Sequence, residues 1–239
     1  SPCQFELGKM LVEELKALGL DNAYMDDKCF VYAKLPATPG YEDKVKLGFI
    51  AHMDTVSDFC DHDIVPVITE NYNGEDFPLG TSGRSLTLTD FPHLADCKGR
   101  TLITSDGTTI LGVDNKAGIA EIMTMLERVI EGNIPHGQIS VAFTPDEEIG
   151  TGAQSFNLEA FDADYGYTLD GDGEGEIQYE NFNAYKAHFD ITGVSVHPGA
   201  SKDVMINASL VAMEINSMLP AGDIPRGTQD YEGFYHLTN

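Results

Sequence analysis

Histidine and carboxylate side chains follow the apolar segments of this sequence, at the points where the expected strands end. They form four clusters: His52 with Asp54, Asp114, Glu147 with Glu148, and Asp170. In an open α/β sheet, ligands bind outside the carboxyl ends of the strands, so residues far apart in sequence are expected to meet along one edge. One imidazole and several carboxylates suit zinc, with cobalt or manganese as substitutes. The spacing therefore predicts a metal site.

Each cluster also has a structural explanation when it is taken alone. A histidine two residues before an aspartate, as in His52 and Asp54, is commonly a surface pair. Asp114 is well placed to begin a helix, because carboxylates are favoured at helix N-termini. Glu147 and Glu148 fit a structural role least well, because adjacent like charges at a strand end repel each other unless a cation offsets them. A shared metal explains all four clusters together.

Alternating strand and helix patterns surround these clusters and must position them. Helices are predicted over residues 5–20 and 116–131, from apolar residues spaced three and four apart. The expected strands are a hairpin of 23–25 and 29–35, followed by 46–51, 102–105, 109–113, 139–144 and 165–169. Residues 71–84 are expected to form a surface excursion. The alternation predicts an α/β domain over residues 1–182, with a mostly parallel sheet flanked by helices.

The pattern changes after residue 182. A strand is predicted over 185–194, a helix over 204–219, and the opening of another strand at 234–237, after a loop rich in Gly and Pro. We expect residues 183–239 to be the start of a separate α+β unit that the sequence does not complete.

The composition narrows the range of partners. A formal net charge of −25 repels phosphate backbones and anionic lipid surfaces, which argues against nucleic acid and membrane as partners. No apolar stretch approaches the roughly 20 residues that cross a bilayer, and no secretory signal pattern is visible. Cys3, Cys29, Cys60 and Cys97 match no zinc knuckle or redox pair and are expected to be reduced thiols. These observations predict a cytoplasmic protein.

Six segments of the sequence form recognisable motifs: GFIAHMD at 48–54, LGVDNKAGIA at 111–120, AFTPDEEIG at 142–150, YTLDG at 167–171, VHPGA at 196–200 and YEGFYHL at 231–237. Together these motifs resemble the peptidase T family, the tripeptide aminopeptidases among the co-catalytic di-zinc metallopeptidases. The resemblance runs essentially from end to end. It implies a catalytic domain of the zinc-exopeptidase type over residues 1–182, followed by part of a lid and dimerisation domain over 183–239.

The resemblance also implies a role for each candidate residue. The implied zinc ligands are His52 and Asp170 for one ion, Glu148 for the other, and Asp114 as a bridge between the two. Asp54 would hold the His52 ring in the required tautomer. Glu147 would be the general base, and His197 would help to stabilise the oxyanion that forms on attack. In this family the peptide bond after the bridging aspartate is cis, which the resemblance implies for Asp114-Asn115.

The implied activity is removal of the N-terminal residue from short peptides, chiefly tripeptides, by a water that two zinc ions activate. The implied partners are short peptides and a second copy of the chain, bound through the lid domain. A dipeptidase, a carboxypeptidase or an N-acyl amino acid deacylase on the same scaffold remains an alternative. A non-catalytic protein that binds metal or peptide is a further alternative from a different class.

One feature departs from the family pattern. Family members run considerably longer, with a return into the catalytic domain that carries the histidine of the second zinc site. None of His62, His93, His136, His188 and His236 lies in a matching motif. A polypeptide of only these 239 residues is therefore expected to have one reasonable zinc site and one incomplete site, and to be inactive or nearly so.

Overall fold

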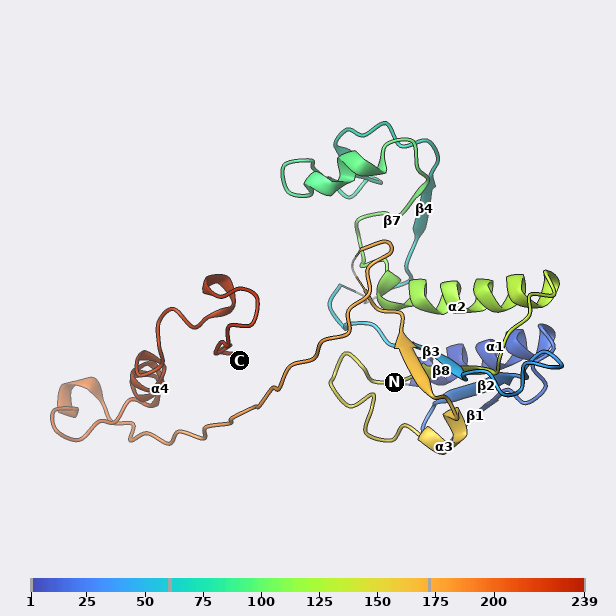
Figure 1. The fold of residues 1–239 in the computed structure, drawn as a ribbon. Coiled ribbons are helices and arrows are strands. Elements are labelled where there is room, and N and C mark those ends of the chain that lie inside the picture. The colour runs from blue at the N-terminus through green and yellow to red at the C-terminus, as the bar shows by residue number, and fades with distance from the viewer. Residues whose placement is uncertain (1, 60–61, 172, 239) are drawn as a thin grey trace. The chain divides into compact units, whose positions relative to one another are not determined.

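The computed structural model describes residues 2–59, 62–171 and 173–238, and Cys60 therefore lies outside the described residues. The chain divides into two compact units, residues 1–178 and residues 179–239 (Figure 1). Each unit is described by itself below. None of the described helices is long and apolar enough to cross a membrane.

A five-stranded mixed sheet forms the centre of the first unit, in the order β1-β2-β8-β3-β9. The strands are β1 (Tyr24–Met25), β2 (Val31–Leu35), β8 (Ile139–Thr144), β3 (Leu47–His52) and β9 (Tyr165–Thr168). β3 pairs in parallel with β8 on one side and with β9 on the other, whereas β2 runs antiparallel to both β1 and β8. The expected α/β class, hairpin and strands 139–144 and 165–169 are confirmed.

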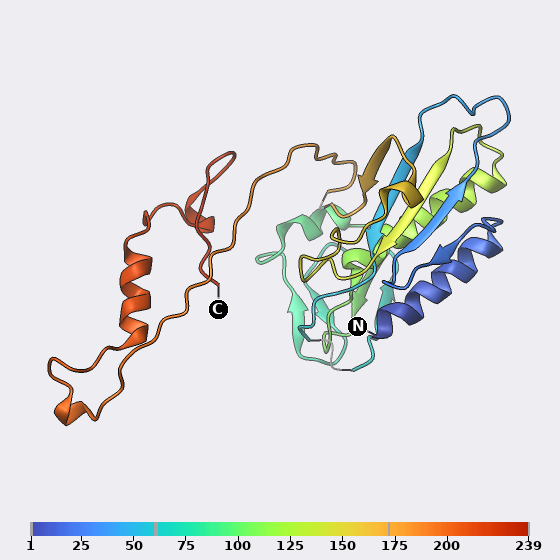
Figure 2. The same ribbon diagram turned by 90° about the horizontal axis from the view of Figure 1, so that it is seen from below.

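Helices cover both faces of this sheet, as Figures 1 and 2 show. α1 (Pro2–Ala17) and α2 (Val113–Glu131) pack on one face, where Leu15 and Ile122 are fully buried against β2 and β8. The short helix α3 (Leu158–Phe161) packs on the other face through Phe161. Because both faces are covered, every residue of β8 is buried, and its residues are apolar apart from Ser140 and Thr144.

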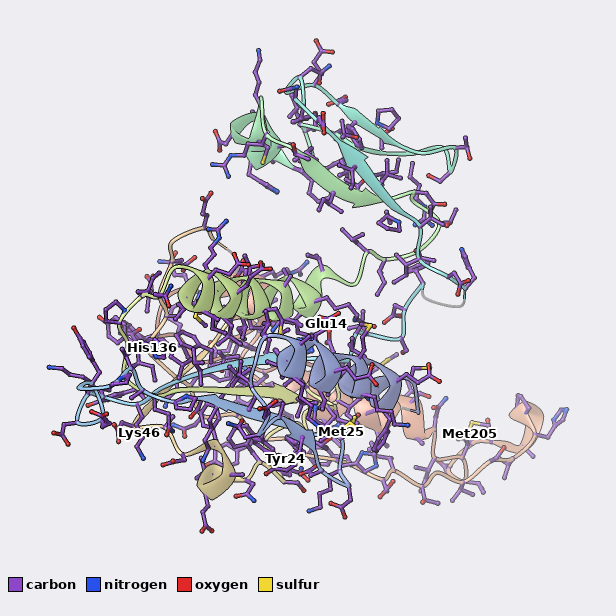
Figure 3. All side chains as sticks on the ribbon, turned by 90° about the vertical axis from the view of Figure 1, so that its right-hand side faces the viewer. Glu14, Tyr24, Met25, Lys46, His136 and Met205 are labelled. Atoms are coloured by element: carbon purple, nitrogen blue, oxygen red, sulfur yellow. The ribbon has the colours of Figure 1, made fainter. Side chains whose placement is uncertain are left out.

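The entry side of the parallel strands is fixed by ion pairs around Asp162, which follows α3. Lys46 and His136 lie at this end of the sheet in Figure 3, just before β3 and β8 begin. Asp162 accepts hydrogen bonds from Lys46 at 2.7 Å and Lys34 at 3.3 Å. With a further bond from Gln138, these contacts hold the pKa of Asp162 at about 2.

A separate ribbon follows β3 and stands away from the central sheet (Figure 1). It contains β4 (Pro66–Thr69), β5 (Phe77–Leu79), β6 (Arg84–Leu86), the 3-10 helix η1 (Pro92–Cys97) and β7 (Leu102–Ser105). β4 pairs only with β7, and β5 with β6, all antiparallel. The predicted strand 102–105 therefore exists but lies outside the central sheet, and the excursion predicted at 71–84 holds β5.

The strand predicted at 109–113 is wrong. A tight turn occupies its start, because the Ser105 hydroxyl donates to the Thr109 carbonyl at 2.8 Å and Gly107 has a φ of +86°. The Ile110 N–H donates to the Phe59 carbonyl instead of joining a strand ladder. The segment is a connection that leads into α2.

The second unit holds one helix of several turns, α4 (Ala208–Ser217), whose N-terminus is capped by the Asn207 side chain. It also holds two short 3-10 helices, η2 (Pro198–Ala200) and η3 (Pro225–Gly227). The predicted strands 185–194 and 234–237 are wrong, because the only pairing among the described residues of this unit is an isolated bridge between Val194 and Ile206. The alternating side chains of 185–194 are mostly exposed and have no sheet to pack on.

Candidate metal and catalytic site

Parallel pairing brings the four sequence clusters to one edge of the sheet. β3 ends at His52, which pairs with Thr144 at the end of β8. On the other side of β3, the Leu169 N–H donates to the Ile50 carbonyl at 2.8 Å, which extends the pairing beyond β9 and places Asp170 beside His52. Asp114 enters the same edge from the first turn of α2. The expected convergence at the carboxyl ends of the strands is therefore observed.

The His52 ring is almost fully buried, with 2% of its surface exposed. Its Nδ1 lies 3.0 Å from the backbone carbonyl oxygen of Asp54 and 3.3 Å from the Asp54 Oδ1 atom. A carbonyl oxygen only accepts hydrogen bonds, so we assign the ring proton to Nδ1. The lone pair of Nε2 then faces the cluster of carboxylates, which is the arrangement that a metal-binding histidine needs.

His52, Asp114 and Asp170 bring three potential metal ligands close together. The ligand atoms of His52, Asp114 and Asp170 all lie within 4.8 Å of one another. Nε2 is 2.9 Å from Asp114 Oδ1 and 3.8 Å from Asp170 Oδ1. Ligands of a tetrahedral zinc ion at 2.0–2.1 Å lie about 3.3 Å apart, a value between these two distances. One imidazole and two carboxylates in this geometry fit a divalent metal of the zinc type.

Asp54 is a partly buried carboxylate, with 10% of its side chain exposed, that contacts both the two glutamates and the histidine. Its Oδ1 accepts the Glu147 N–H at 3.0 Å, and its Oδ2 accepts the Glu148 N–H at 3.1 Å. Its carbonyl oxygen accepts the His52 ring proton, as described above. Asp54 therefore fixes both the ring and the backbone of the segment that follows β8.

Glu147 and Glu148 occupy different positions at this edge. The Glu147 carboxylate is about half exposed and its Oε2 lies 3.9 Å from His52 Nε2, so it borders the three-residue group. Glu148 is partly buried and is not a member of that group. Its assignment to a second metal stays a prediction.

His197 lies in the second unit, where its role in the site also stays a prediction. Its side chain is exposed, and its Nδ1 accepts the Gly199 N–H at 3.1 Å. This contact caps η2 at its N-terminus.

Burial and neighbouring charges shift the pKa values of several groups at this edge. Burial raises the pKa of Glu147, and the Asp170, Glu148 and Asp54 carboxylates raise it further against the opposing effect of His52. Burial also raises the pKa of Asp170. Burial lowers the pKa of His52, but the hydrogen bond that a protonated ring donates from Nε2 to Asp114, together with the charges of the neighbouring aspartates, raises it by more, so its net pKa is raised. The crowded negative charge of this edge therefore favours the protonated forms of Glu147, Asp170 and His52.

The first residues of α2 fix the backbone on which Asp114 lies. The peptide bond between Asp114 and Asn115 is cis, which the family resemblance implied. The Asn115 side chain accepts the Gly118 N–H at 3.1 Å. A side chain at Gly118 would meet the Leu169 carbonyl oxygen at 2.2 Å, so the close approach of α2 to the strand end requires glycine.

Lys116 is a supporting residue to which the sequence assigned no role. Its Nζ donates to the Met53 carbonyl at 3.3 Å, between His52 and Asp54. Burial lowers the pKa of Lys116, opposed by the charge of Asp54. The sequence does contain a signal for the contact of Lys116 with Met53. Lys116 lies two residues after Asp114, on the first turn of a helix that packs on β3.

Solved structures share this fold. An aminopeptidase PepT from Bacillus cereus is 27% identical, with a TM-score of 0.58 over 90% of this chain and 51% of its own. A tripeptidase from Staphylococcus aureus is 25% identical, with a TM-score of 0.59 over 92% of this chain and 52% of its own. Residues 179–238 match the family model described as the peptidase dimerisation domain of the M20 type. The fold is therefore that of the M20-type peptidases.

The chain is also similar in sequence to curated relatives named peptidase T. Peptidase T from Alkaliphilus oremlandii is 50% identical over 98% of this chain, and peptidase T from Bacillus subtilis is 49% identical over 99% of it. These matches confirm the resemblance to peptidase T that the six motifs indicated. The chain spans 58% of the length of both relatives.

Proposed function

We propose that the protein carrying residues 1–239 is a zinc-dependent tripeptide aminopeptidase. The meeting of His52, Asp114 and Asp170 at one strand edge, with Glu147 on its border, is the observation that carries this proposal. The names of the peptidase T relatives support the peptide substrate. The proposed activity is release of the N-terminal residue from short peptides, chiefly tripeptides. This activity fits both the three-residue group and the names of the relatives.

The chain offers ligands for two ions in a complete site. His52 and Asp170 would hold one zinc ion, Glu148 the other, and Asp114 both. Bound zinc would polarise the carbonyl group of the scissile peptide bond and lower the pKa of a water molecule. Cobalt and manganese suit the same ligands and are possible substitutes.

Glu147 would act as the general base and then as the general acid. Its carboxylate is accessible, and its backbone is fixed through the Asp54 carboxylate, so the side chain has a defined starting point beside the three ligands. Glu147 would take a proton from water as the carbonyl carbon is attacked, and give that proton to the amine that leaves. Asp54 would keep the His52 proton on Nδ1 throughout.

The proposal extends to partners and location. The match of residues 179–238 to the dimerisation domain supports a homodimer formed through this unit, to which His197 belongs. Cys3, Cys29 and Cys97 are free thiols, which fits a reducing compartment such as the cytoplasm. The charge of −25 argues against nucleic acid or an anionic membrane as a partner.

The deciding experiment compares Glu147→Gln with wild type in the whole protein loaded with zinc. Because the change removes the proton carrier and no metal ligand of the three-residue group, zinc binding by calorimetry should persist. Hydrolysis of a free tripeptide should fall by roughly 10²–10⁴-fold. The matched control is Glu159→Gln, an exposed residue on α3.

A second experiment identifies the substrate with a panel of free and N-acetylated di-, tri- and tetrapeptides. A preference for acetylated peptides would refute the proposal that the protein is an aminopeptidase.

A further inference from the structure

Gln4, near the start of α1, makes a two-way hydrogen bond with the residue before the two glutamates. Its side chain is 8% exposed, which is low for an amide so close to a chain end. Its Nε2 donates to Asp146 Oδ1 at 2.8 Å, and the Asp146 N–H donates to its Oε1 at 3.2 Å. The two residues are 142 positions apart in the sequence. A single amide thus satisfies both a side-chain acceptor and a backbone donor of Asp146.

Asp146 is the residue whose backbone determines where Glu147 begins. It adopts a left-handed conformation with a φ of +57°, which is uncommon for a residue with a side chain. The chain then closes a turn, in which the Gly150 N–H donates to the Glu147 carbonyl at 2.7 Å and the Thr151 N–H to the Asp146 carbonyl at 3.1 Å. The direction of the Glu147 side chain therefore depends on the conformation at Asp146.

The segment is held from two sides. On one side the Asp54 carboxylate accepts the Glu147 and Glu148 N–H groups. On the other side the Gln4 amide holds Asp146. The first anchor, Asp54, follows directly after β3, and the second, Gln4, lies on α1; both elements are fixed by the same buried core.

We propose that Gln4 is a positioning residue, which orients Glu147 and Glu148 through Asp146. The use of this orientation in catalysis rests on the proposed function. The packing of α1 does not need Gln4, because Leu11 and Leu15 already bury this helix in the core. Glutamate in its place would repel the Asp146 carboxylate, and asparagine is one carbon shorter. The amide of glutamine supplies the donor and the acceptor at the required reach.

Hydrogen exchange on the metal-free chain measures the anchor directly. Gln4→Ala should speed exchange of the amides of residues 146–148 by about tenfold or more, because two hydrogen bonds that restrain the segment are lost. Exchange at Ile122 and Leu126, in the buried part of α2, should not change. The matched control is Glu6→Ala, an exposed position on the same helix, which should leave all of these rates unchanged.

Two changes at Asp146 separate the contact from the backbone conformation. Asp146→Asn keeps an acceptor oxygen and a residue type that tolerates the left-handed region, so it should preserve slow exchange. Asp146→Gly permits the conformation and keeps the N–H that donates to Gln4, but removes the side-chain acceptor, so it should exchange faster than wild type and no faster than Gln4→Ala. Slow exchange in Gln4→Ala, or in Asp146→Gly, would overturn the proposal, as would faster exchange spread evenly through α2.

A kinetic measurement on the zinc-loaded whole protein completes the test. Gln4→Ala should lower kcat for a tripeptide by about tenfold with little change in KM, because Glu147 is displaced while the substrate is still bound. Asp146→Asn should retain the wild-type kcat. An unchanged kcat in Gln4→Ala would refute the positioning role in an active enzyme. A wild-type protein that cleaves no peptide would instead refute the proposed function, and the exchange rates would still decide whether Gln4 holds the segment.

Discussion

Replacing Asp54 by alanine should destabilise the first unit by about 3 kcal/mol, because its carboxylate holds two backbone N–H groups. A hydrogen bond to a charged group contributes about 1.5–3 kcal/mol, so the bonds from Glu147 and Glu148 together contribute about 3–6 kcal/mol. Part of this loss is offset without metal, since removing one negative charge relieves repulsion with neighbouring carboxylates such as that of Glu147. Their exposure to water keeps that relief to about 1 kcal/mol.

The charge and the shape of Asp54 can be separated. Asp54→Asn keeps one oxygen acceptor but loses the charge, and its amide group faces one of the two N–H donors. We expect a loss of about 2 kcal/mol, because charge-assisted hydrogen bonds are roughly twice as strong as neutral ones. With zinc bound, the offset from repulsion disappears and both variants should lose more than they do without metal.

The measurement is urea unfolding followed by far-UV circular dichroism, because the chain contains no tryptophan. The buried core residues all lie in the first unit, so the cooperative transition reports on that unit. Asp21→Ala, at an exposed turn, is the control and should change the free energy of unfolding by less than about 0.5 kcal/mol. A loss below about 1 kcal/mol in Asp54→Ala, with the control unchanged, would refute the claim that this carboxylate supports the site.

Cys29 is buried, and burial raises its pKa to about 11, whereas Cys3 is exposed. Iodoacetamide should therefore modify Cys3 in the native protein and modify Cys29 only after unfolding. Mass spectrometry of the digested peptides measures which cysteine is modified. Gly118→Ala should destabilise by about 3 kcal/mol although alanine is the better helix former, because the new methyl group meets the Leu169 carbonyl; a stabilised variant in urea unfolding would contradict this. Asp162→Asn should lower stability at neutral pH, because the ion pairs that depress the pKa of Asp162 form above its unfolded value of 3.8. The difference from wild type should vanish as pH falls through about 2, and an unchanged difference in acid unfolding curves would exclude this origin.

Most of the central sheet could be predicted because the residues of β2, β3 and β8 are mainly apolar or small. β8 was predicted with its observed bounds, since both of its faces are buried and every residue is apolar or small. The strand predicted at 185–194 failed for the opposite reason. Its alternation of apolar and polar residues is typical of a strand, but pairing depends on a neighbouring strand, and local sequence does not report one.

The site could be predicted at the level of which residues meet, but not how they are held. Strand ends followed by His52 and Asp170 imply convergence as soon as the strands are known to be parallel. The contact of Gln4 with Asp146 has no such signal, because one side chain joins two residues that are 142 positions apart in the sequence. The close fit at Gly118 is also invisible in the sequence, since a glycine within a helical pattern predicts only a weaker helix.

The parallel arrangement of β3 with β8 and β9 also sets the order in which this region can form. His52 meets Asp114 across 62 residues of chain and Asp54 meets the Glu148 amide across 94. Long loops must close before either contact gains any free energy, so such contacts form slowly. A nascent or partly unfolded chain therefore presents scattered acids with little affinity for a cation, and the proposed metal would bind tightly only after this region has folded.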